Sequence, residues 1–99
     1  MLTKIYFFKI LELVLIAPIF EEILFRRIIL KQLMLQNSAI SSLLFSSFLF
    51  AIAHAAILSF LYYFIASMIL GFIFYKTNSL LKCIVFHSVL NITVIILKT

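Results

Sequence analysis

Apolar residues fill most of the chain, and two short polar stretches interrupt them, at residues 36–38 and 76–79. The apolar stretches on either side are long enough for helices, since a membrane-spanning helix takes roughly 20 apolar residues. The pattern predicts four helices, which cover residues 1–35, 39–58, 59–75 and 80–97. Pro18 lies inside the first of them, where a proline removes one backbone hydrogen bond and can kink the helix.

The composition decides where such helices reside. Of the 99 residues, 67% are hydrophobic and only 11% are charged, and the mean hydropathy is +1.33. A soluble domain is about half apolar and about a quarter charged, so most of the surface of this chain is unsuited to water. We therefore predict a single all-α domain over residues 1–99, a polytopic bundle of about four transmembrane helices in the cell membrane.

The net charge of +5 raises the question of a nucleic-acid partner. The basic residues do not cluster for that purpose. Most of them fall near the ends of the apolar stretches, at Lys4, Lys9, Arg27, Lys31, Lys76, Lys82 and Lys98. Lysines and arginines that flank membrane spans are placed in this way, because their charged ends reach the membrane surface. The predicted partner is the lipid bilayer and not a nucleic acid.

Two of the three acidic residues, Glu21 and Glu22, stand side by side within an apolar stretch. An ionisable residue in a membrane span marks a functional site by default. Glu22 lies four residues before Arg26, in the order that favours an ion pair on a helix. Glu21, about 100° away around the helix, would then face the bundle interior, where a carboxylate can act as a general base. Glu12 lies three residues after Lys9 and is predicted to pair with it.

Three more polar side chains lie within the later helices. His54 stands among alanines at positions 53, 55 and 56, which leave clearance for a partner or substrate. His87 and Asn91 are four residues apart, so they share one helical face and could donate hydrogen bonds to a common partner such as a developing oxyanion. The structural alternative is a histidine with one satisfied hydrogen bond, and an interhelical hydrogen bond worth about 1 kcal/mol or less.

The remaining small residues indicate packing. The second helix begins with serines 41, 42, 46 and 47, and small residues allow membrane helices to approach closely. None of these serines lies in a recognisable nucleophile turn. The third helix is aromatic and carries no ionisable group besides tyrosines, so we assign it a structural role, with Gly71 as its close-packing point.

The polar residues form three motifs, each on a different predicted helix. In chain order they are Glu21-Glu22-x-x-x-Arg26, Phe50-x-x-x-His54 and His87-x-x-x-Asn91. This order resembles the CPBP family of intramembrane proteases, which includes the CAAX prenyl endopeptidases and the bacteriocin-processing or immunity proteins (the Abi family). The resemblance covers about positions 12–97. It implies an intramembrane endopeptidase that acts on a peptide or membrane-protein substrate, such as a prenylated CAAX protein, a peptide pheromone or a bacteriocin leader.

The resemblance also assigns roles by position. Glu21 matches the glutamate that activates the attacking water, and His54 matches a histidine that helps to hold that water. His87 and Asn91 match the pair that stabilises the tetrahedral oxyanion. The supporting residues that order the site are matched by Glu22 and Arg26.

The family has been described both as metalloproteases and as metal-independent glutamate proteases. Glu21, His54 and His87 could ligate zinc, because one carboxylate and two imidazoles form known catalytic zinc sites. Asn91 beside His87 is better suited to an oxyanion. The preferred mechanism therefore requires no cofactor, and zinc is the alternative.

Two features depart from the family pattern. Relatives usually carry further membrane helices around the four-helix core, whereas this chain holds little besides that core. A homo-oligomer or a partner subunit could then shelter the site. The residue after Arg26, often glycine in relatives, is Arg27 here, a second cation that could perturb the glutamate or bind lipid headgroups.

Two rival functions remain at this point. One is a non-catalytic bacteriocin-immunity or scaffold protein, in which the motifs serve as structural hydrogen bonds. The other is a small proton-coupled multidrug transporter, in which Glu21 or Glu12 exchanges protons for a cationic drug. The transporter leaves His54, His87 and Asn91 without a role.

Overall fold

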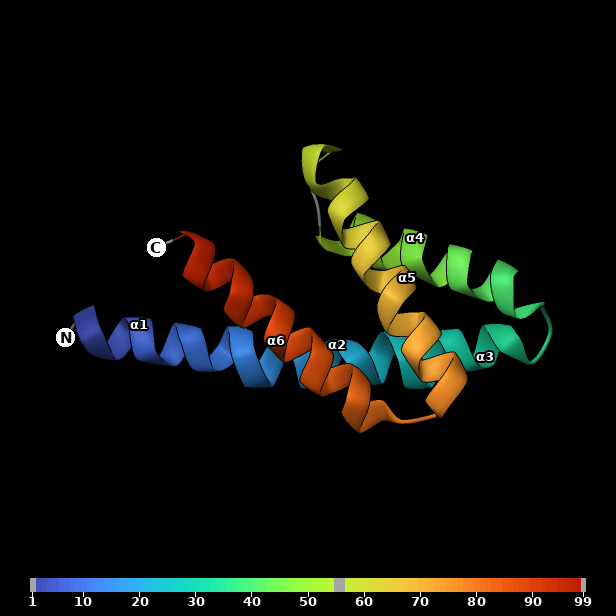
Figure 1. Ribbon diagram of the computed structural model, residues 1–99, viewed down its shortest axis with the longest axis horizontal. Coiled ribbons are helices and arrows are strands. Elements are labelled where there is room, and N and C mark those ends of the chain that lie inside the picture. The colour runs from blue at the N-terminus through green and yellow to red at the C-terminus, as the bar shows by residue number, and fades with distance from the viewer. Residues whose placement is uncertain (1, 55–56, 99) are drawn as a thin grey trace.

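The computed structural model describes residues 2–54 and 57–98, and almost all of that part of the chain is helical (Figure 1). Residues 2–34 form one continuous N-terminal rod of five consecutive segments: α1 (Leu2–Leu11), η1 (Glu12–Ile16), α2 (Ala17–Glu22), η2 (Ile23–Leu30) and α3 (Lys31–Met34). The chain continues with α4 (Ala39–His54), η3 (Ile57–Ser59), α5 (Phe60–Thr77) and α6 (Leu80–Lys98). The all-α prediction is confirmed.

The second helix is shorter than the sequence predicted. α4 ends at His54 instead of near residue 58, and a single 3₁₀ turn, η3, precedes α5. The alanines at positions 55 and 56, which the sequence analysis placed around His54, lie outside the described residues. The prediction overshot because the sequence stays apolar from the end of α4 to η3, with no Gly, Pro or Asn to mark the end of the helix.

The N-terminal rod contains two π-helical segments. The first, η1, ends immediately before α2, where the Ala17 N–H bonds to the Glu12 carbonyl one residue further back than in an α-helix. Pro18 follows directly and has no N–H to continue the regular ladder, which accounts for an irregular turn at this point. The second, η2, carries Phe25 and Arg26. Because η1, α2 and η2 follow one another directly, the rod remains helical on both sides of Pro18.

Serine side chains cap the helices that follow the two polar breaks, and a residue in the left-handed conformation ends the helix before the second break. The Ser38 hydroxyl accepts a hydrogen bond from the Ser41 N–H at the start of α4, and the Ser79 hydroxyl accepts one from the Lys82 N–H at the start of α6. Asn78 ends α5 with φ 51° and donates its N–H to the Phe74 carbonyl at 2.7 Å. Asparagine tolerates this conformation better than most residues.

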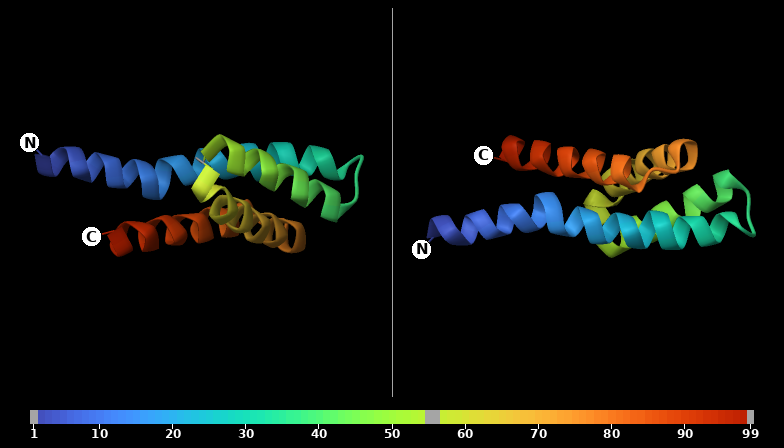
Figure 2. Two further views of the ribbon diagram at one scale, coloured as in Figure 1. Left: turned by 90° about the horizontal axis from the view of Figure 1, so that it is seen from above. Right: turned by 90° about the horizontal axis from the view of Figure 1, so that it is seen from below.

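The helices form an elongated molecule whose two chain ends lie at the same side (Figures 1 and 2). Its principal extents are 50 × 28 × 17 Å. α4 and α5 make the most extensive contact between helices, while the rod contacts α6 through η1 and α2, and contacts α4 through η2. The middle of the rod, where the two glutamates lie, is therefore enclosed by the later helices.

A small apolar core lies at the crossing of the rod with α4, α5 and α6. Its fully or almost fully buried members are Leu30, Leu43, Leu70, Phe74 and Cys83. Gly71 lies beside this core, and a Cβ atom added there would come within 2.7 Å of the Leu43 Cδ2 atom. The prediction that Gly71 is a close-packing point is confirmed. Serines 42, 46 and 47 are also buried, as the packing interpretation requires.

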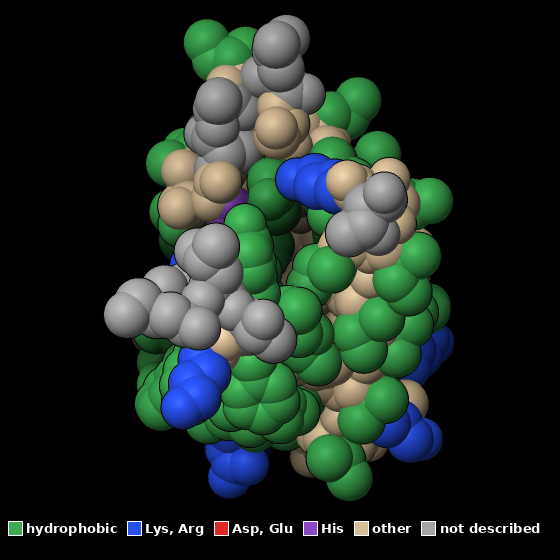
Figure 3. Space-filling model, turned by 90° about the vertical axis from the view of Figure 1, so that its left-hand side faces the viewer, with side chains coloured by type: hydrophobic (Ala, Val, Ile, Leu, Met, Phe, Trp, Pro, Cys, Tyr) green, Lys and Arg blue, Asp and Glu red, His purple; other side chains and the backbone are tan. Residues whose placement is uncertain are grey.

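Most large apolar side chains lie on the surface and not in this core. α5 and α6 are long and apolar enough to cross a membrane, yet only 22% and 11% of their residues are buried. A core helix of a soluble protein would be mostly buried, so these helices are suited to lipid. Figure 3 shows the face at the chain ends as largely apolar, with lysines and arginines towards its edges.

The predicted number of about four spans stays a prediction. Two described helices pass the length and composition test for a span, while α4, at 16 residues, is shorter and the N-terminal rod is divided by its π segments. α5 and α6 have 18 and 19 residues, about 27 and 29 Å at 1.5 Å per residue. That length matches a hydrocarbon layer of about 30 Å.

We expect Gly71→Val to lower the stability of the fold by roughly 1–3 kcal/mol, because the new side chain overlaps Leu43. Thermal unfolding in detergent micelles would measure the loss. Ala53→Val, at an exposed position on α4, is the matched control and should have little effect. A second substitution, Leu43→Ala, should recover part of the loss. Equal melting temperatures for Gly71→Val and the control would contradict the close-packing interpretation.

Candidate active site

The two adjacent glutamates take different environments. Glu22 is fully buried, and its Oε1 atom lies 3.1 Å from Nε of Arg26, which is also fully buried. Glu21 keeps 29% of its side chain exposed and lines a cavity. The helical offset of about 100° per residue explains the division. The predicted Glu22–Arg26 pair is confirmed, and so is the exposed pair between Lys9 and Glu12, at 3.6 Å.

Arg26 links the rod to two other helices. Its Nη2 atom donates to the Ser67 carbonyl on α5 at 3.4 Å. Its guanidinium lies 5.1 Å from the centre of the Phe50 ring on α4, within cation–π range. Arg27, in contrast, is exposed and is not among the residues that line the cavity. The buried arginine therefore fixes the position of Glu22 relative to α4 and α5.

His87 of α6 bridges both glutamates. Its Nδ1 atom lies 2.7 Å from Oε2 of Glu22, and its Nε2 atom lies 3.4 Å from Oε1 of Glu21. The ring is almost fully buried. Because the Glu22 carboxylate is already paired with Arg26, the short Nδ1 contact fixes the orientation of the imidazole. Its other nitrogen is thereby directed at Glu21.

His54, at the end of α4, approaches Glu21 from the other side. Its Nε2 atom lies 3.2 Å from Oε2 of Glu21, and its Nδ1 atom lies 2.8 Å from the Phe50 carbonyl. The imidazole stacks on the Phe50 ring at 4.1 Å and on the Tyr63 ring at 5.3 Å. Each oxygen of the Glu21 carboxylate therefore faces one imidazole nitrogen.

The contacts of His54 constrain its protons. A carbonyl oxygen can only accept, so Nδ1 carries the hydrogen and donates it to Phe50. In the neutral ring Nε2 is then an acceptor, and a carboxylate oxygen is also an acceptor. The 3.2 Å contact with Glu21 therefore requires a proton on one of the two groups. The site is arranged to hold and transfer a proton between a carboxylate and an imidazole.

Asn91 lies one turn beyond His87 on α6, but the two side chains have different partners in the protein. The Asn91 Nδ2 atom donates to the Leu13 carbonyl at 2.7 Å, across 78 residues of sequence. An amide nitrogen carries two hydrogens, so one remains for another acceptor. Asn91 lines the same cavity as Glu21 and both histidines. The predicted common partner, a substrate oxyanion, stays a prediction.

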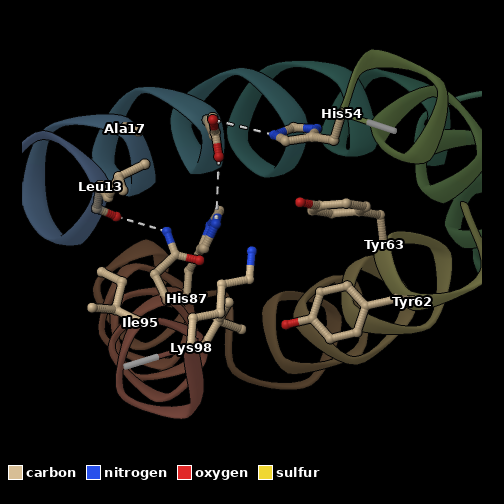
Figure 4. A pocket seen from close by; sticks show the side chains of 11 residues that line it. Leu13, Ala17, His54, Tyr62, Tyr63, His87, Ile95 and Lys98 are labelled. Carbon is tan, nitrogen blue, oxygen red and sulfur yellow. Dashed lines mark hydrogen bonds and ion pairs between the residues drawn. The ribbon is translucent and has the colours of Figure 1, made fainter. Parts of the chain in front are cut away.

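The side chains of Glu21, His54, His87 and Asn91 line one cavity of about 300 Å³ (Figure 4). Sequence reasoning missed three polar residues that line it, namely Tyr62, Tyr63 and Lys98. The first turn of α5, to which the sequence analysis gave a structural role, thus also lines the cavity. Tyr63 stacks on His54 across the cavity, a contact that the sequence of α5 alone does not indicate.

The donor atoms that a zinc ion would use are occupied with one another. Within residues 2–54 and 57–98, no group of three or more His, Cys, Asp or Glu side chains is arranged to hold a metal ion. Both histidine Nε2 atoms contact the Glu21 carboxylate, at 3.2 and 3.4 Å.

Arg26→Met should destabilise the fold strongly, because it leaves the Glu22 carboxylate buried without its cation. The loss of one partner of a buried ion pair typically costs about 3–5 kcal/mol. Thermal unfolding in detergent would show it, with Arg27→Met at the exposed neighbouring position as the control. Adding Glu22→Gln to Arg26→Met should return part of the loss. Equal melting temperatures for Arg26→Met and Arg27→Met would show that the Glu22–Arg26 ion pair does not stabilise the fold.

Comparisons with known proteins agree with the motif resemblance. A family model described as type II CAAX prenyl endopeptidase Rce1-like matches residues 3–93, which include both glutamates, both histidines and Asn91. Neither the curated proteins nor the solved structures gave a match. The family match covers most of the chain and contains the whole of the proposed site. The chain therefore belongs to the Rce1-like family of type II CAAX prenyl endopeptidases.

Proposed function

We propose that this chain is a multi-pass endopeptidase of the cell membrane that hydrolyses a peptide bond near the C-terminus of a CAAX-type substrate, with Glu21 as the general base. One observation carries the proposal. The Glu21 carboxylate lines a cavity with one imidazole on each of its oxygens. The far nitrogen of each ring is engaged elsewhere, by Phe50 or by Glu22.

The first step is the addition of water to the scissile carbonyl. Glu21 accepts a proton as one O–H bond of the water breaks, and the water oxygen bonds to the carbonyl carbon. His54 helps to hold the water, and its position beside Glu21 at 3.2 Å supports this role. The carbonyl π electrons move to oxygen and give a tetrahedral oxyanion.

The second step is collapse of this intermediate. His87 and the remaining N–H of Asn91 stabilise the oxyanion, a form of catalysis in which fixed donors meet developing charge. The Nδ1–H of His87 is used by Glu22, so His87 donates through Nε2 and acts in this step as the doubly protonated ring. The proton held by Glu21 is delivered to the amine nitrogen as the C–N bond breaks. One product leaves with a new carboxyl group and the other with a new amino group, so the water is fully consumed.

Glu22 and Arg26 act as positioning residues and do not touch the substrate. Glu22 orients His87 through the 2.7 Å contact to Nδ1, and Arg26 holds Glu22 in place through the 3.1 Å ion pair. This arrangement resembles the carboxylate that orients an imidazole in other hydrolases. It fixes which nitrogen of His87 is directed into the cavity.

Replacing Glu21 with glutamine should abolish proteolysis, because the amide keeps the shape but cannot accept the proton of the water. A general base contributes roughly 10²–10⁴-fold to the rate. The measurement compares protein N-termini in membranes of cells that express the wild-type chain or Glu21→Gln. Termini present only with the wild type would identify the substrate and its cleavage site.

Glu12→Gln is the matched control, since Glu12 is exposed, pairs with Lys9 and does not line the cavity. It should leave the new termini intact. Identical termini for wild type and Glu21→Gln, with both proteins stably inserted, would overturn the proposed activity and favour a non-catalytic scaffold.

Asn91→Asp should lower kcat by about 10²–10³-fold with little change in KM, because an acceptor-only carboxylate replaces a donor to the oxyanion. Steady-state kinetics with a purified substrate peptide would separate the two constants. A rise in KM at unchanged kcat would instead assign Asn91 to binding of the ground state.

A further inference from the structure

One cation lines the cavity, and the proposed reaction does not use it. Lys98, in the last turn of α6, is the one lysine or arginine among the described residues that line this space. Figure 4 shows its amino group projecting into the cavity, on the same side as Tyr62. Within the described residues, no carboxylate forms an ion pair with it. An ammonium placed in this way is available to bind an anionic group of a ligand.

The distance along α6 between His87 and Lys98 indicates how long a ligand must be to reach from the reacting groups to the lysine. Lys98 lies eleven residues after His87, which is about 16 Å along a helix axis at 1.5 Å per residue. Both side chains tilt towards the N-terminus of the helix, so the gap between their ends shrinks only by the greater length of lysine, to roughly 14 Å. An ionic contact takes about 3 Å of this length, which leaves a gap of roughly 11 Å. An extended peptide covers about 3.3–3.6 Å per residue, so about three residues span this gap.

The walls between the two ends are apolar, with Leu13, Val94 and Ile95 among them. They are suited to aliphatic side chains of a short peptide segment. The hydroxyl groups of Tyr62 and Tyr63 supply further hydrogen-bond donors in the same cavity. The cavity therefore has a reacting end at Glu21, an apolar middle and a cationic end.

We infer that Lys98 binds the free C-terminal carboxylate of the substrate, about three residues beyond the scissile bond. This inference rests on the proposed function. It adds a residue whose contact with the C-terminal carboxylate determines how many residues follow the scissile bond in the bound peptide. A lipid phosphate carries the same kind of anionic oxygens, so the test must separate the two sources.

The test measures binding and cleavage of one fluorescent prenylated peptide with a Cys-aliphatic-aliphatic-X ending, prepared with a free C-terminal acid or with a C-terminal amide. Binding is measured by fluorescence anisotropy on the Glu21→Gln protein in phosphatidylcholine vesicles, so that no cleavage is needed. The acid should bind roughly tenfold more tightly than the amide, or more, as expected for a hydrogen bond to a charged group. Lys98→Met in the same background should remove that difference by weakening the acid alone.

Lys4→Met is the matched control, because Lys4 belongs to the first turn of α1, whose N-terminal end lies at the same end of the molecule (Figure 1), and does not line the cavity. It should keep the preference for the acid. In the active protein, Lys98→Met should raise KM for the acid roughly tenfold, leave the amide unchanged and alter kcat little.

Other outcomes overturn the inference. Equal binding of acid and amide by the Glu21→Gln protein would show that the carboxylate is not recognised. If Lys98→Met weakens the binding of acid and amide equally, Lys98 does not recognise the carboxylate. If phosphatidylglycerol in the vesicles causes the same equal weakening in the Glu21→Gln protein that keeps Lys98, Lys98 binds a lipid phosphate. Binding that discriminates as expected, without any cleavage by the wild-type chain, would instead overturn the proposed function and leave the carboxylate site standing.

Discussion

The buried pair between Glu22 and Arg26 is the interaction on which the rest of the site depends. Two fully buried charges in an apolar bundle are tolerated only when they are paired and their remaining hydrogen-bonding groups are used. Here Nη2 of the arginine engages the Ser67 carbonyl and Oε2 of the glutamate engages His87, while Nη1 of Arg26 has no hydrogen-bond partner among the described residues. The contacts that join the rod to α5 and α6 are therefore also the contacts that orient the site.

Several of these relations could be predicted from sequence alone. Acid-first spacing of four residues predicted the partner of Glu22, and the helical offset predicted that Glu21 would face another environment. A single glycine in an aromatic helix predicted which point of α5 allows close packing, though not the neighbour that packs there. These predictions succeeded because they concern one helix at a time, where the period of the helix fixes which side chains share a face.

Relations between helices could not be predicted in this way. Nothing in the sequence indicates that Asn91 bonds the Leu13 carbonyl, because a backbone acceptor has no sequence signature. Leu13 lies in η1, the π segment that precedes α2, and η1 is one of the segments that contact α6. The tyrosines of α5 were missed for a related reason. Aromatic residues in a membrane helix usually contact lipid, and only the three-dimensional arrangement places two of them beside His54.

The position of the chain ends has a consequence for sidedness. Both termini lie at one end of the molecule, and Lys98, at the cavity, belongs to that same end (Figure 1). In the proposed multi-pass arrangement, a tag on either terminus would therefore report the compartment on the side of the Lys98 end of the cavity. Mapping the exposure of the termini to a membrane-impermeant reagent would thus indicate into which compartment the fragment released by the proposed reaction diffuses.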